Sequence, residues 1–406
     1  MISKRIDLFS YALVAILIIV SNDTLFFGTN GIHFFLSIPR YGAIVLCLLL
    51  LAMPRLTKPS ARDVLVLLCL FVPYVFSSLL RESSFTLFGI FFLCILVGYL
   101  VATRLSFNKF AICFETIVFY LCIFAVVGEL FAYLFPGLLN LFPKIQNVSG
   151  CSFSKLLFCN IETGSANSLL IRNGGIFREP GVFQIYINFA LMINLFYVKR
   201  KSLLKFAVYS LALLFTFSTP GYVCYLLILI VYVLSFKKTT NNKSKASLMA
   251  GVVLLCLALV GVVLLSSKQL FDLVFGKLGD FQNGSFLSRL NSIVADYYMV
   301  KSSPLVGVGM AKVDELTVYY AETVLHIYAD CNSNGVFYQF AAYGLVFGLV
   351  YFFGLICVTR NFRLNKILTI ALALIFLLLF FGERLESCFP YIFMFYGIES
   401  FSNKKE

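Results

Sequence analysis

The sequence predicts an all-α integral membrane protein with about 12 transmembrane helices, formed by a single polytopic domain over residues 1–406. Hydrophobic residues make up 61% of the chain and charged residues only 13%, and the mean hydropathy is +0.94. A soluble domain could not bury this much apolar surface. The apolar residues also fall into runs near the ~20 residues that a helix needs to cross a bilayer.

The predicted spans follow one another along the chain, separated by polar or basic segments. In order they are 6–21, 33–53, 63–80, 85–102, 110–135, 176–198, 203–218, 220–236, 246–265, 333–358, 367–381 and 388–402. No small-residue cleavage site follows Val20, so we expect the first run to be a retained helix and not a signal peptide.

The basic residues predict the orientation of these spans. Most of the 32 Lys and Arg residues lie in segments that follow an even number of spans. Because basic residues are enriched in cytoplasmic loops, both termini are expected to be cytoplasmic. This topology accounts for the net charge of +13, so the charge implies no nucleic-acid partner.

Two loops, about 136–175 and 266–332, are longer than the others and lie outside the cytoplasm in this topology. Loops beyond about 12–15 residues are usually functional or disordered. Within the second, residues 287–300 have an amphipathic pattern that predicts a helix lying on the membrane surface. Its apolar face consists of Leu290, Ile293, Val294 and Tyr297.

The segment from Arg172 to Gly181 is the most informative in the chain. It places Arg172, Arg178 and Glu179 directly before the apolar segment 182–198. An arginine costs roughly +2.5 to +3.5 kcal/mol at the centre of a bilayer, so charge beside hydrocarbon needs water, a partner or an anionic ligand. A functional site is therefore expected here.

Further candidates lie in the same predicted external loops. With Arg178 and Glu179, they are Arg172, Arg289, Asp296, Lys301, His326 and Asp330. Guanidiniums bind diphosphate oxygens in a bidentate manner and stabilise the charge that develops on a departing phosphate. This set suits an anionic lipid-linked substrate; the alternative is that the arginines pair with carboxylates of the loops.

Gly307, Gly309 and His326 each have two interpretations. The backbone N–H groups of the two glycines could bind an anion, or the glycines could form a tight turn that returns the loop to the membrane. His326 could accept a proton from a sugar hydroxyl, as histidines do in general base catalysis, but a single loop histidine is usually without such a role.

Polar residues within the spans indicate contacts inside the bundle. Arg40 and Glu129 lie toward the outer leaflet, where they could pair, line a cavity or reach the interface. Gln184 and Asn188 lie one helical turn apart and should face the bundle interior.

Most of the 12 cysteines lie in apolar segments as small packing residues. Cys151 and Cys159 are external and could form a disulfide or stay as free thiols. The two histidines, His33 and His326, lie far apart, and no metal-ligand spacing is present, so no metal site is predicted.

On these residues the chain resembles the O-antigen polymerase (Wzy-type) family of the O-antigen ligase/polymerase superfamily. The resemblance covers the architecture of about twelve spans and two enlarged periplasmic loops. Its motifs are Arg-x-x-Gly-Ile-Phe-Arg-Glu-Pro-Gly at 172–181, Ser-Thr-Pro-Gly at 218–221, Ser288-Arg289-Leu290, Pro304-x-x-Gly307-x-Gly309, and Asn332-Ser333 opening a span with Tyr343-Gly344.

The resemblance implies a metal-independent, lipid-phosphate-sugar (GT-C-like) glycosyltransferase of the bacterial inner membrane, with its active site facing the periplasm. Such an enzyme polymerises undecaprenyl-diphosphate-linked repeat units during O-antigen synthesis, part of lipopolysaccharide biosynthesis. The implied partners are these lipid-linked glycans, membrane lipids and a chain-length regulator protein. No cofactor is expected, because the donor already carries an activated anomeric carbon.

By the resemblance, Arg178 and Arg289 would engage the diphosphates of donor and acceptor. Many relatives have a histidine directly before the asparagine of the last motif, where this chain has Cys331, so Glu179 and His326 remain candidates for the general base. The predicted substrate-binding residues are Arg172, Lys301, Gly307, Gly309 and Asn332.

Two other functions stay open. An O-antigen ligase would transfer the glycan to lipid A core, but the missing histidine before Asn332 and the Arg-Glu-Pro-Gly motif favour a polymerase. A flippase or secondary transporter would be expected to show repeated halves with broken helices, and the sequence shows no such repeat.

Overall fold

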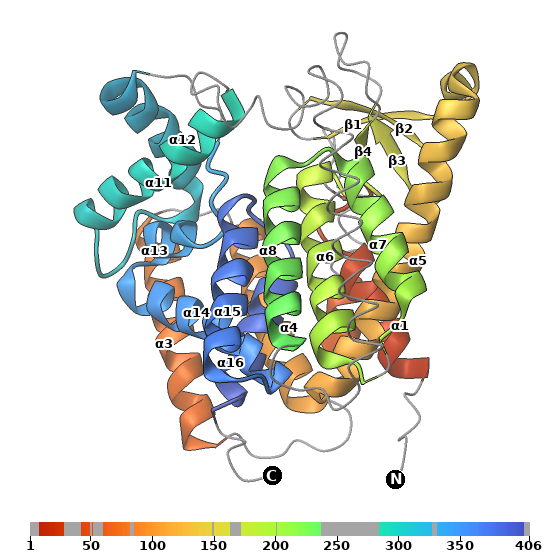
Figure 1. Ribbon diagram of the computed structural model, residues 1–406. Coiled ribbons are helices and arrows are strands. Elements are labelled where there is room, and N and C mark those ends of the chain that lie inside the picture. The colour runs from red at the N-terminus through yellow and green to blue at the C-terminus, as the bar shows by residue number, and fades with distance from the viewer. Residues whose placement is uncertain are drawn as a thin grey trace.

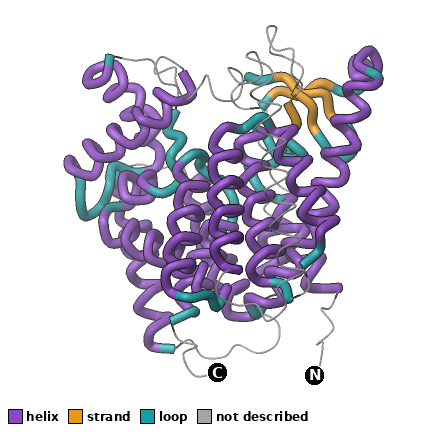
Figure 2. Tube along the Cα trace, in the orientation of Figure 1, coloured by secondary structure: helices purple, strands orange, loops and turns teal. Residues whose placement is uncertain are grey.

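The computed structural model shows a mostly helical protein with a small sheet at one end of the helical bundle (Figures 1 and 2). It describes residues 8–27, 42–48, 51, 60–81, 85–147, 150–162, 172–199, 201–236, 284–326 and 331–401. The predicted span 246–265, most of the span 33–53, and the candidates Arg40 and Asp330 lie outside these residues.

The helices of the first part of the chain follow the predicted spans closely. They are α1 (Leu8–Ile19), α3 (Ala61–Leu80), α4 (Phe85–Arg104), α5 (Phe107–Leu134), α6 (Pro180–Met192) with the π-helix η2 (Ile193–Tyr197), α7 (Leu203–Thr216) and α8 (Thr219–Phe236). Capping explains one start: Ser60 and Asp63 at the N-terminus of α3 form a reciprocal capping box.

The second part contains the α11–α12 pair and the last spans. Its helices are α11 (Gly284–Ser302), α12 (Met310–Tyr320) with the π-helix η3 (Ala321–Leu325), α13 (Phe337–Tyr343), α14 (Leu345–Cys357) with η4 (Val358–Phe362), α15 (Lys366–Phe381) and α16 (Phe389–Glu399). Most of the predicted loop 266–332 that is described is therefore helical.

By length and composition, four helices among the described residues could cross a membrane. They are Ala61–Leu80, Phe107–Leu134, Pro180–Tyr197 and Leu345–Phe362. Shorter apolar helices accompany them, at Leu8–Ile19, Phe88–Arg104, Leu203–Thr216, Thr219–Ser235 and Lys366–Phe381. The structure supports transmembrane character, while the number of twelve spans stays a prediction.

The loop 136–175 departs from the all-α prediction. After η1 (Pro136–Leu141) it forms a four-stranded antiparallel sheet in the order β1 (Lys144–Gln146), β2 (Ser152–Lys155), β3 (Asn160–Glu162) and β4 (Arg172–Asn173). Strands of two to four residues are too short to show the alternation by which a strand is recognised in a sequence. The sheet packs on the end of α5.

Helix α11 confirms the predicted helix and shows which face is exposed. Leu290, Ile293 and Tyr297 are 42%, 39% and 63% exposed, while Asn291 and Asp296 on the opposite face are buried. The predicted apolar face thus points outward, while the buried face combines Asn291 and Asp296 with the apolar Ala295 and Met299. An exposed apolar face fits a helix that lies against lipid.

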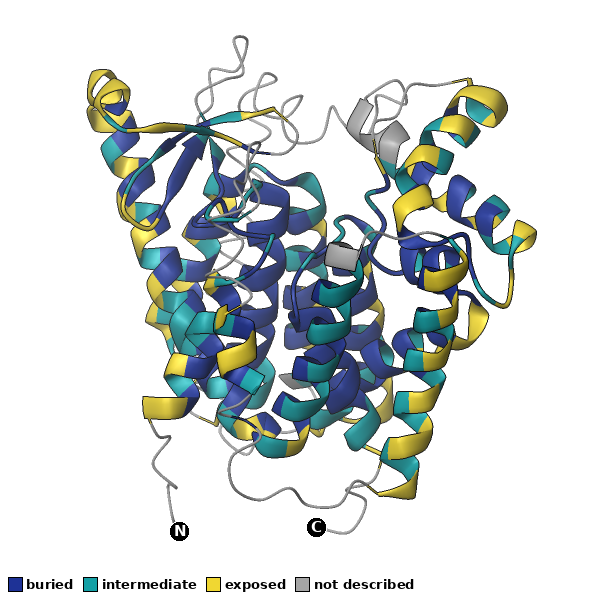
Figure 3. Ribbon diagram, turned by 180° about the vertical axis from the view of Figure 1, so that it is seen from behind, coloured by how far each residue is buried: buried dark blue, intermediate teal, exposed yellow. Residues whose placement is uncertain are grey.

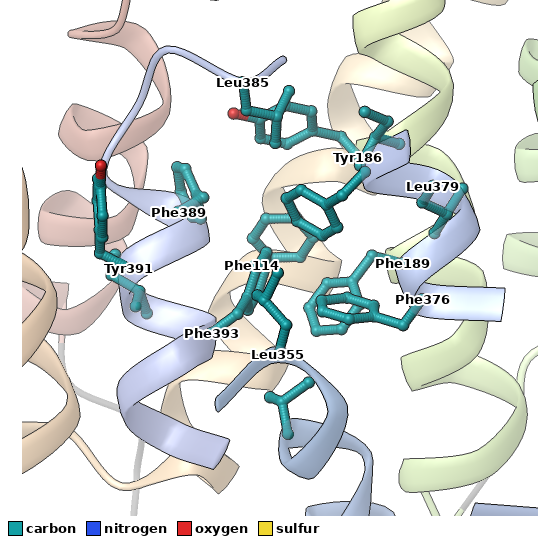
Figure 4. Packing of buried hydrophobic residues seen from close by; sticks show 14 of the residues in the cluster. Phe114, Tyr186, Phe189, Leu355, Phe376, Leu379, Leu385, Phe389, Tyr391 and Phe393 are labelled. Atoms are coloured by element: carbon teal, nitrogen blue, oxygen red, sulfur yellow. The ribbon is translucent and has the colours of Figure 1, made fainter. Parts of the chain in front are cut away.

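The core lies at the centre of the bundle (Figure 3) and combines aliphatic residues with many aromatic side chains that contact one another (Figure 4). Phe114 of α5 stacks on Tyr186 of α6 with ring centroids 5.8 Å apart, and Phe393 of α16 contacts Phe189 of α6 at 4.4 Å. Beside this core, the side-chain amide of Asn188 donates to the side-chain oxygen Oε1 of Gln184 at 3.0 Å. Both side chains are fully buried, which confirms that this polar pair faces the interior.

The predicted span 333–358 is divided at Gly344 into α13 and α14. Gly344 has φ +86°, and a Cβ added there would lie 2.2 Å from the carbonyl oxygen of Leu305. Leu345 donates its N–H to the carbonyl of Pro304, so the 303–309 turn docks on this break. Only glycine combines the positive φ with so close a backbone approach.

We expect Gly344→Ala to destabilise the protein, because alanine at positive φ alone costs about 1–3 kcal/mol and its Cβ would displace the Leu305 carbonyl. Gly137→Ala in η1 is the matched control, since nothing lies within 4 Å of its added Cβ. Thermal unfolding in detergent measures both variants. Equal melting temperatures would contradict the docking of the turn on Gly344.

The contacts between loops gather at two opposite ends of the bundle. Segments predicted as external contact one another: Arg81 donates to Ser303, and Asn147 donates to the carbonyl of Arg178. At the other end, Arg62, which is predicted as cytoplasmic, donates to the carbonyl of Ile398, which lies within the predicted span 388–402. The sidedness of these two ends stays a prediction.

Candidate functional site

Residues 172–181 form β4, a turn and the first residues of α6, at the end of the bundle that carries the sheet (Figure 1). The turn is tied to the segment after α1, because Phe177 forms a β-bridge with Thr24 and the N–H of Arg178 donates to the carbonyl of Asp23 at 2.7 Å. The backbone of Arg178 is thereby fixed by residues more than 150 positions away.

The side chain of Arg178 is 14% exposed and lies against two partners. Its Nη2 donates to the carbonyl oxygen of Arg384 at 3.0 Å, and its Nη1 lies 3.8 Å from Oε1 of Glu179. Asn147 holds the backbone carbonyl of Arg178 through a 3.0 Å hydrogen bond. The guanidinium is thus positioned by the main chain as much as by a charge.

The partner of Arg178 belongs to the short segment Gly382-Glu-Arg-Leu-Glu-Ser387, which joins α15 to α16. This segment was not among the predicted site residues, although three charges in six residues between two apolar spans are a signal for a site. In the structure its residues contact Arg178, Arg289, the segment that follows α1, and helix α12.

Arg289 reaches the same segment from α11. Its Nε donates to the carbonyl of Gly382 at 3.0 Å, and its Nη2 lies 3.3 Å from Oε1 of Glu383. Arg178 and Arg289, 111 positions apart in the chain, therefore bind carbonyls of residues only two positions apart. This brings together the two arginines that the resemblance marks as essential.

Arg384 is a third arginine at this site. It makes a bidentate pair with Asp314 of α12, at 3.0 and 3.3 Å, and pairs with Glu386 at 3.1 Å. Its guanidinium also lies over the ring of Tyr338, 4.7 Å from the centroid. Arg384 thus connects the α11–α12 pair to the rest of the bundle.

Two more carboxyls complete the site on the side of α1. Oδ1 of Asp23 accepts the N–H of Glu386 at 2.7 Å, and Oδ2 accepts the hydroxyl of Tyr186 at 3.2 Å. Burial raises the pKa of Asp23 above its ordinary value. Burial would also raise the pKa of Glu386, but the charges of Arg384 and Arg178 outweigh it and lower that pKa.

We call this set the charged cluster. It consists of Arg178, Arg289 and Arg384 with Asp23, Glu179, Asp314, Glu383 and Glu386. The sequence predicted a mainly basic site, whereas here carboxyls outnumber guanidiniums. Burial raises the pKa of Asp23 above its ordinary value and that of Glu383 to about 7, so both carboxyls hold a proton more readily than exposed ones do.

The other predicted basic residues lie apart from these contacts. Arg172 pairs with Glu162, its neighbour across β3 and β4, with Nη1 3.3 Å from Oε2. This is the pairing with a loop carboxylate that the sequence left open. Lys301 lies exposed in the last turn of α11.

Gly307 and Gly309 form the tight turn, with φ of +76° and +86°. Their N–H groups donate to the carbonyls of Ser303 and Ala342 at 3.0 and 3.1 Å. A Cβ on Gly307 would lie 2.4 Å from the backbone of Ala342. The two N–H groups considered for anion binding are therefore used within the protein, and the structural interpretation of this motif holds.

Asn332 and His326 differ in their relation to the charged cluster. Asn332 is buried, donates its side-chain amide to Asp296 at 2.7 Å, and donates its backbone N–H to Asp314 at 2.9 Å, so it holds a member of the cluster. His326 is exposed at the end of η3 with φ +54°. Among the described residues, no hydrogen bond or ion pair links His326 to the charged cluster.

Cys151 and Cys159 are both free thiols, the first exposed and the second buried against Gly128. The described part of the chain holds no group of three His, Cys, Asp or Glu residues suited to a metal ion. Glu129 is fully buried in α5, and within that same part neither of its carboxyl oxygens has a hydrogen-bond partner.

A pocket of about 540 Å³ lies at the opposite end of the bundle, between the start of α3 and the ends of α4 and α16. Its charged lining residues are Arg62, Asp63, Arg104 and Glu399. None of the predicted site residues lines it, so it is separate from the charged cluster.

A scan against protein-family models finds no match for the chain, and a search of curated proteins finds none either. What can be said of function therefore rests on the residues of the charged cluster and their contacts.

Proposed function

We propose that the protein is a bacterial inner-membrane glycosyltransferase that polymerises undecaprenyl-diphosphate-linked repeat units in the periplasm. The observation that supports this most is the convergence of Arg178 and Arg289 on the 382–387 segment. Two guanidiniums held by backbone carbonyls are preorganised for an anion such as a diphosphate. A site at the membrane surface would suit a substrate whose lipid stays in the bilayer.

The chemistry requires an attacking hydroxyl, a departing lipid diphosphate and a proton acceptor. The sugar hydroxyl of one lipid-linked unit attacks the anomeric carbon of the other, and the bond to the diphosphate breaks with its electron pair on the phosphate oxygen. Guanidiniums near that oxygen stabilise its charge. Positioning and charge stabilisation then supply the catalysis.

The sidedness of the site follows from the positive-inside pattern, with the charged cluster outside and the pocket lined by Arg62 and Arg104 inside. Alkaline phosphatase fused at Lys155 should then be active, and the same enzyme fused at Arg360 inactive. The reverse result would place the charged cluster in the cytoplasm, away from the proposed substrate.

Deleting the gene and separating the lipopolysaccharide of the cells on a gel tests the function. A polymerase predicts that only single-repeat O-antigen remains on the core. Complete loss of O-antigen would instead indicate a ligase, and accumulation of lipid-linked units inside the cell would indicate a flippase. An unchanged ladder would contradict all three.

Because guanidiniums supply the positive charge in this mechanism, we expect polymerisation to need no divalent metal ion. Purified protein given lipid-linked repeat units should extend them at an unchanged rate in excess EDTA. Loss of extension in EDTA that magnesium or manganese restores would contradict this expectation.

A further inference from the structure

Glu383 lies beside Arg289 and against the first turn of α6, shortly after Arg178. Its Oε1 lies 3.3 Å from Nη2 of Arg289, and a Cβ added to Gly181 would lie only 2.2 Å from the same oxygen. The glycine in the first turn of α6 therefore lets the carboxyl of Glu383 reach the N-terminus of this helix, next to the Arg178 segment. The Glu383 side chain is 13% exposed.

The two proton acceptors considered from the sequence are placed differently. The Glu179 side chain is 27% exposed and pairs with Arg178, and one of its oxygens also accepts a hydrogen bond from Asn147 at 3.5 Å. His326 lies exposed at the end of η3. Of these three side chains, that of Glu383 is the least exposed to solvent, and it contacts Arg289 directly.

The charges around Glu383 tune its protonation. Burial raises the pKa of Glu383 to about 7, repulsion from Glu179 acts in the same direction, and Arg289 and Arg178 oppose both. Gly335 packs against the backbone of Glu383, and the segment around it, residues 332–336, contains no charged residue. A carboxyl that titrates near the working pH is the best suited to accept and release a proton.

We propose that Glu383 is the proton acceptor of the glycosyl transfer, a role that rests on the proposed function. As the acceptor hydroxyl oxygen bonds to the anomeric carbon, its proton passes to the Glu383 carboxylate. The bond between the anomeric carbon and the diphosphate oxygen breaks at the same time, and the electron pair leaves with the lipid diphosphate. The proton then returns to water before the next transfer.

The test is the pH dependence of kcat for purified protein given lipid-linked repeat units at saturating concentration. The rate of the unmodified protein should fall as the pH drops through about 7, because protonated Glu383 cannot accept a proton. Glu383→Gln should lower kcat by roughly 10²–10⁴-fold. It should also abolish the decrease of kcat at acidic pH, which is the acidic limb of the pH profile. Glu383→Asp keeps a carboxylate and should retain part of the rate and the limb.

Glu322→Gln is the matched control, because Glu322 lies exposed in η3, outside the charged cluster. It should leave kcat and the pH profile unchanged. Thermal unfolding of each variant separates loss of catalysis from loss of fold.

Three results would overturn the proposal. Near-normal kcat in Glu383→Gln would exclude proton transfer to this residue. A raised KM for the lipid-linked donor with the acidic limb intact would show that Glu383 only positions Arg289. Unmodified protein that never extends lipid-linked units at any pH would remove the proposed function, and this role with it, whereas the first two results leave the proposed function standing.

Discussion

Replacing Arg178 or Arg289 with alanine should abolish polymerisation while the protein still inserts into the membrane. Removing one preorganised donor to a developing negative charge typically costs 10²–10³-fold in rate. Here each arginine is held by a backbone carbonyl of the 382–387 segment, so its position does not depend on the substrate. We expect a loss of at least ~10²-fold for either variant.

Lysine should not replace either residue well. A planar guanidinium can donate to Arg384 or Gly382 and still present N–H groups to a phosphate, whereas a lysine ammonium is a compact point charge on a flexible stem. Arg178→Lys and Arg289→Lys should therefore retain only a small part of the activity.

Gels of lipopolysaccharide from complemented deletion cells measure the effect, with protein amount in the membrane measured alongside. Arg360→Ala is the matched control, because Arg360 stacks on Phe401 beyond α14, away from the charged cluster. Full ladders from well-expressed Arg178→Ala or Arg289→Ala protein would show that the residue has only a structural role.

Arg384→Ala should cause the largest loss of stability at the site. It removes a bidentate pair with Asp314, a pair with Glu386 and the stacking on Tyr338. Asp314 then has no paired cation among its described contacts, and Glu386 keeps only the influence of Arg178. Breaking a buried pair costs about 3–5 kcal/mol. The loss here should lie near the lower end, because the Asp314 side chain is 42% exposed and solvent screens it.

Thermal unfolding in detergent measures this loss, and a double-mutant cycle assigns it. Arg384→Ala combined with Asp314→Ala should cost less than the two single substitutions added together, because the second removes a charge that the first has already left unpaired. Additive effects would contradict a direct interaction. Arg384→Lys, which keeps the charge without the bidentate geometry, should lie between the unmodified protein and Arg384→Ala.

The same substitution should reduce polymerisation through the position of Arg289. Asp314 belongs to α12, which packs on α11, so loss of the Arg384–Asp314 pair frees the helix pair that carries Arg289. Normal activity in a destabilised Arg384→Ala protein would show that α11 is held in place by other contacts.

The sequence by itself determined the helical segments. The helix from Phe107 to Leu134 and the helix from Lys366 to Phe381 differ from their predicted spans by three residues at most at either end. Long apolar runs identify helices well, because each residue adds to the same signal. The sequence also indicated Arg178 and Arg289, through motifs beside apolar segments.

Only the tertiary structure decided what these arginines contact. Their common partner, residues 382–387, is too short for any periodic pattern, and its contacts span about 90 to 200 positions of the chain. The sheet of residues 144–173 escaped prediction for a similar reason, since its strands are stabilised by pairing with one another and not by a pattern within each strand.

The placement of Glu383 shows most clearly what folding added. Nothing in the local sequence sets its carboxyl against Gly181 or beside Arg289, since these residues lie on three separate segments. Hydrophobic packing of α6, α11, α15 and α16 in one core brings those segments together, and the resulting burial raises the pKa of the carboxyl. The sequence thus determined which segments are helices, and the packing between them determined which charges meet.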